Sequence, residues 1–124
     1  MLRTLSFIFL VMIGFTAFAA QPAHAAIEGE QAKIEDLLDA FNEPGIIFIR
    51  NGEEHDGAWA RKHLKEKLDE TKDVKTAEDF ITKVASMSRE SGKPYMVKMK
   101  DGKEMAAGKW LQKKLEEINA MPRK

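Results

Sequence analysis

The sequence contains no cysteine. This absence excludes disulfides, a thiol nucleophile, thiolate metal sites and a lipid-modified cysteine. Small exported domains often depend on disulfides, so a domain of this size without them must be stabilised by core packing alone.

The chain has one long apolar run, and it lies at the N-terminus behind the single positive charge of Arg3. Small residues at 17–19 and again at 23–25 match the A-x-A pattern of a signal-peptidase site. The second site follows Gln21-Pro22, where the apolar helix of a leader ends. We therefore expect a signal peptide over residues 1–25, cleaved after Ala25, with cleavage after Ala19 left open. The protein would then be periplasmic (or secreted).

An excess of charge of either sign is also missing, with 20 lysines and arginines against 20 aspartates and glutamates. Removing residues 1–25 removes Arg3 and no acid, which leaves a net charge of about −1. Such a chain has no general attraction to nucleic acid or to anionic lipid. We expect neither nucleic acid nor, after removal of the leader, a membrane as partner.

Apolar residues recur at helical spacing in four segments. The first covers about 30–41 and ends at a Pro-Gly break. Asp56 is placed to cap the second, a capping box over 76–79 opens a third whose inner face reaches Ser88, and the fourth begins near Gly108. The residues expected on the inner faces are Ile34, Leu37, Leu38, Phe41, Ala60, Leu64, Leu68, Phe80, Ile81, Val84, Ser88, Leu111, Leu115 and Ile118.

Two short segments have the composition or alternation of β-strands, 46–50 and 95–99. Each is followed closely by a hairpin-type dipeptide, Asn51-Gly52 and Asp101-Gly102. We therefore predict an α+β fold in which about four helices pack on a small, mostly antiparallel sheet. Residues 26–124 would form this single domain.

The order helix, break, strand, turn and helix occurs twice, from Ile34 to Leu68 and from Phe80 to Leu115. This similarity suggests a pseudo-repeat of helix-strand-turn-helix units. Aligning the leucines Leu64 and Leu111 makes the second link between turn and helix three residues shorter.

Residues that could carry catalysis are few. After the leader only His55, expected in a turn, and His63, expected on a helix, remain, and their spacing matches no metal site. Three serines, Ser86, Ser88 and Ser91, have no neighbouring base in the sequence. Adjacent acids such as Glu53-Glu54 point apart and do not converge on one bond. We predict a non-enzymatic protein with no catalytic residue, no metal and no cofactor.

Exposed binding residues are the better candidates. Arginine, tyrosine and tryptophan dominate interaction hot spots, although Tyr95, Trp59 and Trp110 are also suited to filling the core. Arg50 stands out because the turn that follows it does not require an arginine. The candidate binding residues are Arg50, Asn51, His55, Ser91, Lys93 and Tyr95.

Four motifs occur in order: FIRNGEEH from Phe48, HLKEKL from His63, TAEDFI from Thr76 and SGKPYMV from Ser91. In these motifs the chain resembles the YfeK-like family of small exported bacterial proteins, a domain of unknown function. The resemblance covers about Ile34 to Leu115. It implies a periplasmic location and a shared fold, and it implies no activity.

Residues Ser91 to Tyr95 also fit the S-G-x-x-Y pattern of one class of periplasmic lysozyme inhibitors, which are β-barrels. Two functions follow as expectations. The first is a binding or interaction module for an unknown periplasmic protein or cell-envelope component. The alternative is an inhibitor of a cell-wall hydrolase such as lysozyme, acting through Ser91–Tyr95.

Overall fold

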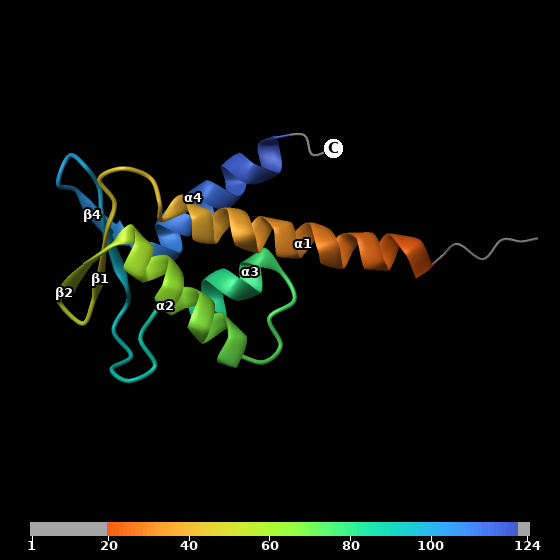
Figure 1. Cartoon of the computed structure of the whole chain (residues 1–124), viewed down its shortest axis with the longest axis horizontal. Helices are drawn as coiled ribbons and strands as arrows, with labels where there is room; N and C mark the ends of the chain where they lie inside the picture. The colour runs from red at the N-terminus through yellow and green to blue at the C-terminus, as the bar shows by residue number, and fades with distance from the viewer. Residues whose placement is uncertain (1–19, 122–124) are drawn as a thin grey trace, which may run out of the picture.

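The structure, a computed structural model, describes residues 20–121, and the side chains from residue 28 onward. Most of the predicted signal peptide and the tail from residue 122 lie outside the described residues. Four helices, a short π-helix and one sheet make up the fold, which confirms the predicted α+β class (Figure 1). In chain order the elements are α1 (Ala20–Ala40), β1 (Ile47–Arg50), β2 (Glu53–Asp56), α2 (Gly57–Glu70), α3 (Ala77–Asp79), η1 (Phe80–Val84), β3 (Met96–Lys98), β4 (Glu104–Ala106) and α4 (Ala107–Ala120).

The sheet consists of two hairpins placed side by side, in the strand order β2-β1-β3-β4, and every neighbouring pair is antiparallel. Its centre is the β1–β3 pair, where Phe48 lies opposite Val97. The outer strand of each hairpin runs directly into a helix, β2 into α2 and β4 into α4. At both edges of the sheet, the edge strand is therefore the second strand of a hairpin and continues into a helix.

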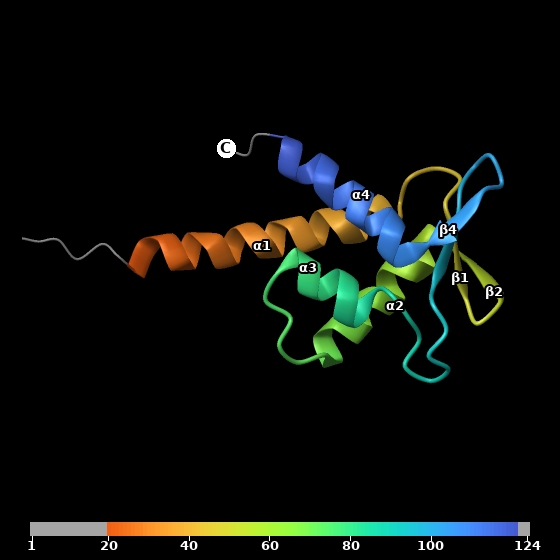
Figure 2. The same cartoon turned by 180° about the vertical axis from the view of Figure 1, so that it is seen from behind.

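The helices lie together on one side of the sheet, and α1 runs away from it (Figures 1 and 2). Phe48 and Val97 are fully buried beneath these helices. Phe41 at the end of α1 joins the layers, because its ring packs edge-on against Phe48 at 5.7 Å and against Trp110 of α4 at 5.0 Å. The expected apolar inner-face residues of all four helical segments lie in or against this core, and Ser88 is buried as a polar residue.

Both hairpin helices begin five residues after their turn glycine, Gly57 after Gly52 and Ala107 after Gly102. The shorter second link inferred from the leucines is therefore wrong. Leu64 and Leu111 do not hold matching positions, because Leu111 lies about one turn closer to the start of its helix than Leu64 does.

The prediction that the first helix starts near Glu30 is wrong, because α1 already begins at Ala20 and includes the predicted cleavage position. Pro22 does not prevent this, since a proline in the first turn removes an N–H that has no helical partner. Among the described residues no helix is both long and apolar enough to cross a membrane.

The predicted third helix also differs. Its capping box between Thr76 and Asp79 is present, but the helix changes to the π-form at Phe80 and ends at Val84, before Ser88. The Ala85 N–H donates to the Phe80 carbonyl at 3.0 Å, and this wider turn releases the chain into the loop 85–95. His55, expected in a turn, lies instead in β2.

Candidate functional site

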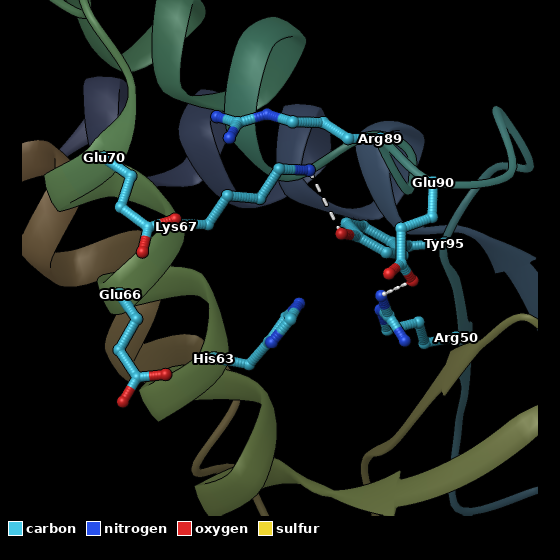
Figure 3. Close-up of a pocket in the computed structure, with 8 residues that line it drawn as sticks. All are labelled: Arg50, His63, Glu66, Lys67, Glu70, Arg89, Glu90 and Tyr95. Carbon is cyan, nitrogen blue, oxygen red and sulfur yellow. Dashed lines mark hydrogen bonds and ion pairs between the residues drawn. The ribbon is translucent and has the colours of Figure 1, made fainter.

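A pocket of about 310 Å³ lies where α2, the end of β1 and the loop 85–95 meet (Figure 3). We call it the Lys67 pocket. Three separate parts of the chain supply its walls, so it exists only in the folded domain. Its lining residues are Arg50, His63, Glu66, Lys67, Glu70, Arg89, Glu90 and Tyr95.

Lys67 is the buried cation of this pocket, with 7% of its surface exposed. Its Nζ donates to the Met87 carbonyl oxygen at 2.7 Å and to the Tyr95 hydroxyl at 3.0 Å. Both acceptors are uncharged, and Tyr95 is itself 1% exposed. Because η1 ends at Val84, the chain that follows it brings the Met87 carbonyl within hydrogen-bond distance of Lys67 on α2.

Burial changes the protonation of the groups in the pocket. It lowers the pKa of Lys67 to about 8, and the positive charges of Arg89 and Arg50 act in the same direction. The pKa of His63 is lowered by burial and then by Arg50 and Lys67. Burial raises the pKa of Tyr95, with Arg50 opposing it. At neutral pH His63 is therefore an uncharged imidazole, and Tyr95 keeps its proton.

Arg50 lies at the end of β1, and its Nη2 and Nε atoms have different surroundings. Nη2 donates to Glu90 Oε1 at 2.7 Å, and this hydrogen bond raises the pKa of Arg50. Nε is buried and has no hydrogen-bond partner among the described residues, and the same holds for Nε2 of His63. An unsatisfied buried polar group costs about 1–3 kcal/mol, so these two atoms are the natural contacts for a ligand.

The carboxylates of the pocket lie at its rim. Glu66 and Glu70 are exposed on α2, and the Glu90 side chain is 78% exposed despite its ion pair with Arg50. Within residues 28–121 no three histidine or acidic side chains gather in a way that could hold a metal ion. The pocket thus has a cationic interior and an acidic margin.

A stack of three rings supports one wall. His55 of β2 lies parallel to Trp59 with ring centroids 3.6 Å apart, and Trp59 lies parallel to His63 at 4.8 Å. Trp59 and His63 are four residues apart, so they lie on one face of α2. His63 and Tyr95 then form a T-shaped pair with ring centroids 6.3 Å apart. The stack holds the His63 imidazole at the pocket.

The turn after Arg50 is tied to the loop 85–95. Asn51 and Gly52 both have positive φ angles, 52° and 83°, as a type I′ turn requires. Asn51 Nδ2 donates to Ser88 Oγ at 3.5 Å, and Ser91 Oγ donates to Asn51 Oδ1 at 2.5 Å. These bonds hold the end of β1, which carries Arg50, against the loop that leads to Tyr95.

The six residues predicted as a binding site therefore separate into four groups. Arg50 and Tyr95 line the pocket, and Asn51 and Ser91 brace it from outside. His55 lies at the far end of the ring stack, and Lys93 is exposed and does not line the pocket.

Sequence reasoning missed most of the pocket, including its central lysine. His63 and Lys67 are four residues apart on α2, a spacing that places them on one helix face. That spacing was the available signal, but it lies in a run of charged residues that reads as a solvated surface. Only the packing of the loop 85–95 against α2 makes Lys67 a buried residue.

Comparison with known proteins agrees with the motifs. The chain matches the Family of unknown function (DUF5329) over residues 28–119. It is 43% identical over 77 residues to an uncharacterised protein of Salmonella typhimurium (strain LT2), YfeK, covering 60% of this chain and 64% of that protein. No solved structure matches the chain. The resemblance seen in the sequence is thereby confirmed, and the chain belongs to this YfeK-like family of unknown function.

Proposed function

We propose that this protein is an exported, non-enzymatic binding module whose Lys67 pocket takes the carboxylate of a small ligand. One observation carries the proposal: Arg50 Nε and His63 Nε2 are buried, have no hydrogen-bond partner within the described part of the chain, and belong to residues that line the same pocket. A ligand oxygen that accepts a hydrogen bond from Arg50 would remove that cost of about 1–3 kcal/mol.

The charges favour a monoanion. Arg50 and Lys67 provide positive charge inside the pocket, whereas Glu66, Glu70 and Glu90 surround its mouth. A carboxylate with one charge gains the interior attraction with less repulsion at the rim than a phosphate dianion does. The volume of about 310 Å³ is at the lower end for ligand sites, which suits a ligand of few heavy atoms.

Glu90 occupies the position that the ligand carboxylate would take. It holds Arg50 Nη2 at 2.7 Å, yet its side chain is mostly exposed. Exposed ion pairs of this kind contribute little to stability. A ligand carboxylate can displace Glu90 and bind Arg50 through two parallel N–H donors, which is the stronger geometry.

The test is an NMR titration of the protein with acetate and, separately, inorganic phosphate, observing the Arg50 Nε–H signal. We expect acetate to shift this signal and phosphate to bind more weakly. Arg50→Gln should weaken acetate binding about tenfold or more, because a charge-assisted hydrogen bond is lost. Glu90→Gln should tighten binding, because the competing carboxylate is gone.

Arg61→Gln is the matched control, since Arg61 is an arginine of α2 that pairs with Glu35 and Asp39 away from the pocket. It should bind acetate like the wild type. An unchanged Arg50 signal at saturating acetate, or equal affinities of the Arg50 and Arg61 variants, would overturn the proposal.

Export is part of the proposal and has its own test. Cell fractionation should find the protein in the periplasm or medium, and sequencing its N-terminus should begin at Ala26. A start at Ala20 would move the cleavage site, and a cytoplasmic protein that keeps Met1 would contradict export.

Inhibition of a cell-wall hydrolase is the alternative function. Residues 91–94 are exposed and Ser91 is held by its hydrogen bond to Asn51, whereas the Tyr95 side chain is buried. The protein in excess would slow lysozyme clearance of cell-wall suspensions if this alternative holds, and Ser91→Ala would reduce the effect. Clearance at an unchanged rate in the presence of excess protein would exclude inhibition of lysozyme.

A further inference from the structure

The contact between Lys67 and Tyr95 has the geometry of a reactive amine beside a proton donor. Lys67 Nζ lies 3.0 Å from the Tyr95 hydroxyl and 2.7 Å from the Met87 carbonyl oxygen. Two of the three positions around this nitrogen are therefore filled by protein acceptors. No third hydrogen-bond partner of Nζ is found among the described residues, and the amine lines the pocket (Figure 3).

The surroundings of Lys67 also favour the uncharged amine, which is the nucleophilic form. Burial and the nearby Arg89 and Arg50 lower its pKa from 10.5 to about 8. Relative to an ordinary lysine, this raises the fraction of free amine at neutral pH on the order of 100-fold. Glu66, Glu70 and Glu90 line the pocket too, but none of them forms an ion pair with Lys67 within the described residues.

We propose that Lys67 captures a small 2-oxo acid by forming a reversible imine with its carbonyl carbon, while Arg50 holds the neighbouring carboxylate. This inference rests on the proposed carboxylate pocket and names the ligand class. In such an acid the carbonyl and carboxylate carbons are bonded to each other. The protein can match this arrangement, because Lys67 and Arg50 line the same pocket and the Tyr95 hydroxyl accepts a hydrogen bond from Lys67 there.

The reaction balances without any further reagent. The Nζ lone pair attacks the carbonyl carbon, and the C–O π electrons move to oxygen, which takes the proton of the Tyr95 hydroxyl. Nζ returns a proton to the Tyr95 oxygen, giving the carbinolamine. The carbinolamine hydroxyl then takes the proton of Tyr95 and leaves as water while the C=N bond forms. Nζ gives its remaining proton to the Tyr95 oxygen, which restores the Tyr95 hydroxyl. The net change is amine plus ketone to imine plus water.

Tyr95 suits this role because burial raises its pKa and keeps the hydroxyl protonated at neutral pH. The pocket also limits water, since Lys67 and Tyr95 are both almost fully buried. Limited water favours the imine, whose formation releases water.

The experiment traps the imine. The full domain is incubated with pyruvate and sodium cyanoborohydride, and the alkylated lysines are located by peptide mass spectrometry. We expect Lys67 to be modified at least tenfold faster than the other lysines, such as the exposed Lys62 on the same helix. Acetone, which has the carbonyl but no carboxylate, should react at least tenfold more slowly. The trapping rate should rise with pH toward about 8, the pKa of Lys67.

Lactate separates the two proposals, because it has the carboxylate of pyruvate without the carbonyl. If lactate and pyruvate both shift the Arg50 Nε–H signal but Lys67 is not trapped, the imine fails and the carboxylate pocket stands. If neither compound binds and nothing is trapped, both proposals fail. Trapping spread evenly over all lysines also overturns the imine, and this outcome is read on the wild type without any variant. Lys67→Arg should abolish the selective adduct, and Arg50→Gln should slow it about tenfold.

Discussion

The unit formed by β1, β2 and α2 has the same order of elements as the unit formed by β3, β4 and α4: two strands followed by a helix. Phe48 and Val97 face each other at the centre of the sheet, and on the outer strands His55 lies opposite Phe48 as Met105 lies opposite Val97. Each outer strand continues into a helix, at Gly57 in the first unit and Ala107 in the second. The same order of elements thus carries two different sets of side chains.

The difference lies in what covers each helix. Trp110 of α4 is 5% exposed and packs on Phe41 of α1. Trp59 of α2 is half-buried between two imidazoles, with Lys67 two turns further along. The second unit is closed by apolar packing, whereas the first is covered by the polar loop 85–95. The site lies in the unit whose covering is polar.

The largest difference should appear when each tryptophan is removed. Trp110→Ala should lower the free energy of unfolding by about 3–5 kcal/mol, because a fully buried ring leaves a cavity. Trp59→Ala should lower it by only about 1–2 kcal/mol, because its ring remains partly in solvent. Urea denaturation measures both, and equal losses would show that the units are equally packed.

The first helical residue of each unit gives the next comparison. A Cβ at Gly57 would lie 1.7 Å from the Phe41 carbonyl oxygen, so Gly57→Ala forces the backbones of α1 and α2 apart. We expect a loss of about 3 kcal/mol. Ala107 already has a Cβ in the matching position, and Ala107→Gly should cost about 1 kcal/mol. Thermal or urea unfolding that ranks the two variants the other way would contradict the close approach of α1 to α2.

The main pH-dependent effect should come from Lys67, in the first unit. The pKa of Lys67 is about 8 in the folded protein and near 10.5 when unfolded, so between these values the unfolded chain binds more protons. Lys67 therefore costs stability when charged, and that cost disappears as pH rises from about 8 to about 10. The stability of Lys67→Met relative to wild type should fall over this window, on the order of 1–3 kcal/mol after solvent screening.

Urea denaturation at pH 7, 8, 9 and 10 measures this difference. Lys62→Met, a change on the exposed face of α2, is the control and should show a constant difference from wild type. A constant difference for Lys67→Met as well would mean that its amine is solvated in the folded protein.

The smallest effect should be the same in both units. Gly52 and Gly102 have φ angles of +83° and +88°, and a Cβ at either would meet no atom of the described residues within 4 Å. Gly52→Ala and Gly102→Ala should each cost about 1 kcal/mol, from the backbone alone. A difference of more than about 1 kcal/mol between them would show that one turn has tertiary contacts that the other lacks.

Much of the fold was predictable because it depends on local patterns. The Asp56 cap accepts a hydrogen bond from the Trp59 N–H at 2.8 Å, and the capping box at Thr76 forms as expected. The π-turn at Phe80 was not predictable, since its inner residues have the same spacing as those of an α-helix. Arg50 and Tyr95 were found because their types stand out, whereas Lys67 was hidden among other charged residues.

The sequence by itself determined that helices form around these inner faces, the two hairpin turns and the family, because periodicity, caps and turn dipeptides act over a few residues. It did not determine where the first helix begins or how the third one ends. Only the tertiary structure decided that Lys67, Tyr95 and Arg50 share one pocket, and that Arg50 Nε and His63 Nε2 are buried there with no hydrogen-bond partner among residues 28–121. The physical reason is that burial and a shifted pKa depend on which segments pack together. Residues of α2, β1 and the loop 85–95 meet through contacts that no short stretch of sequence encodes.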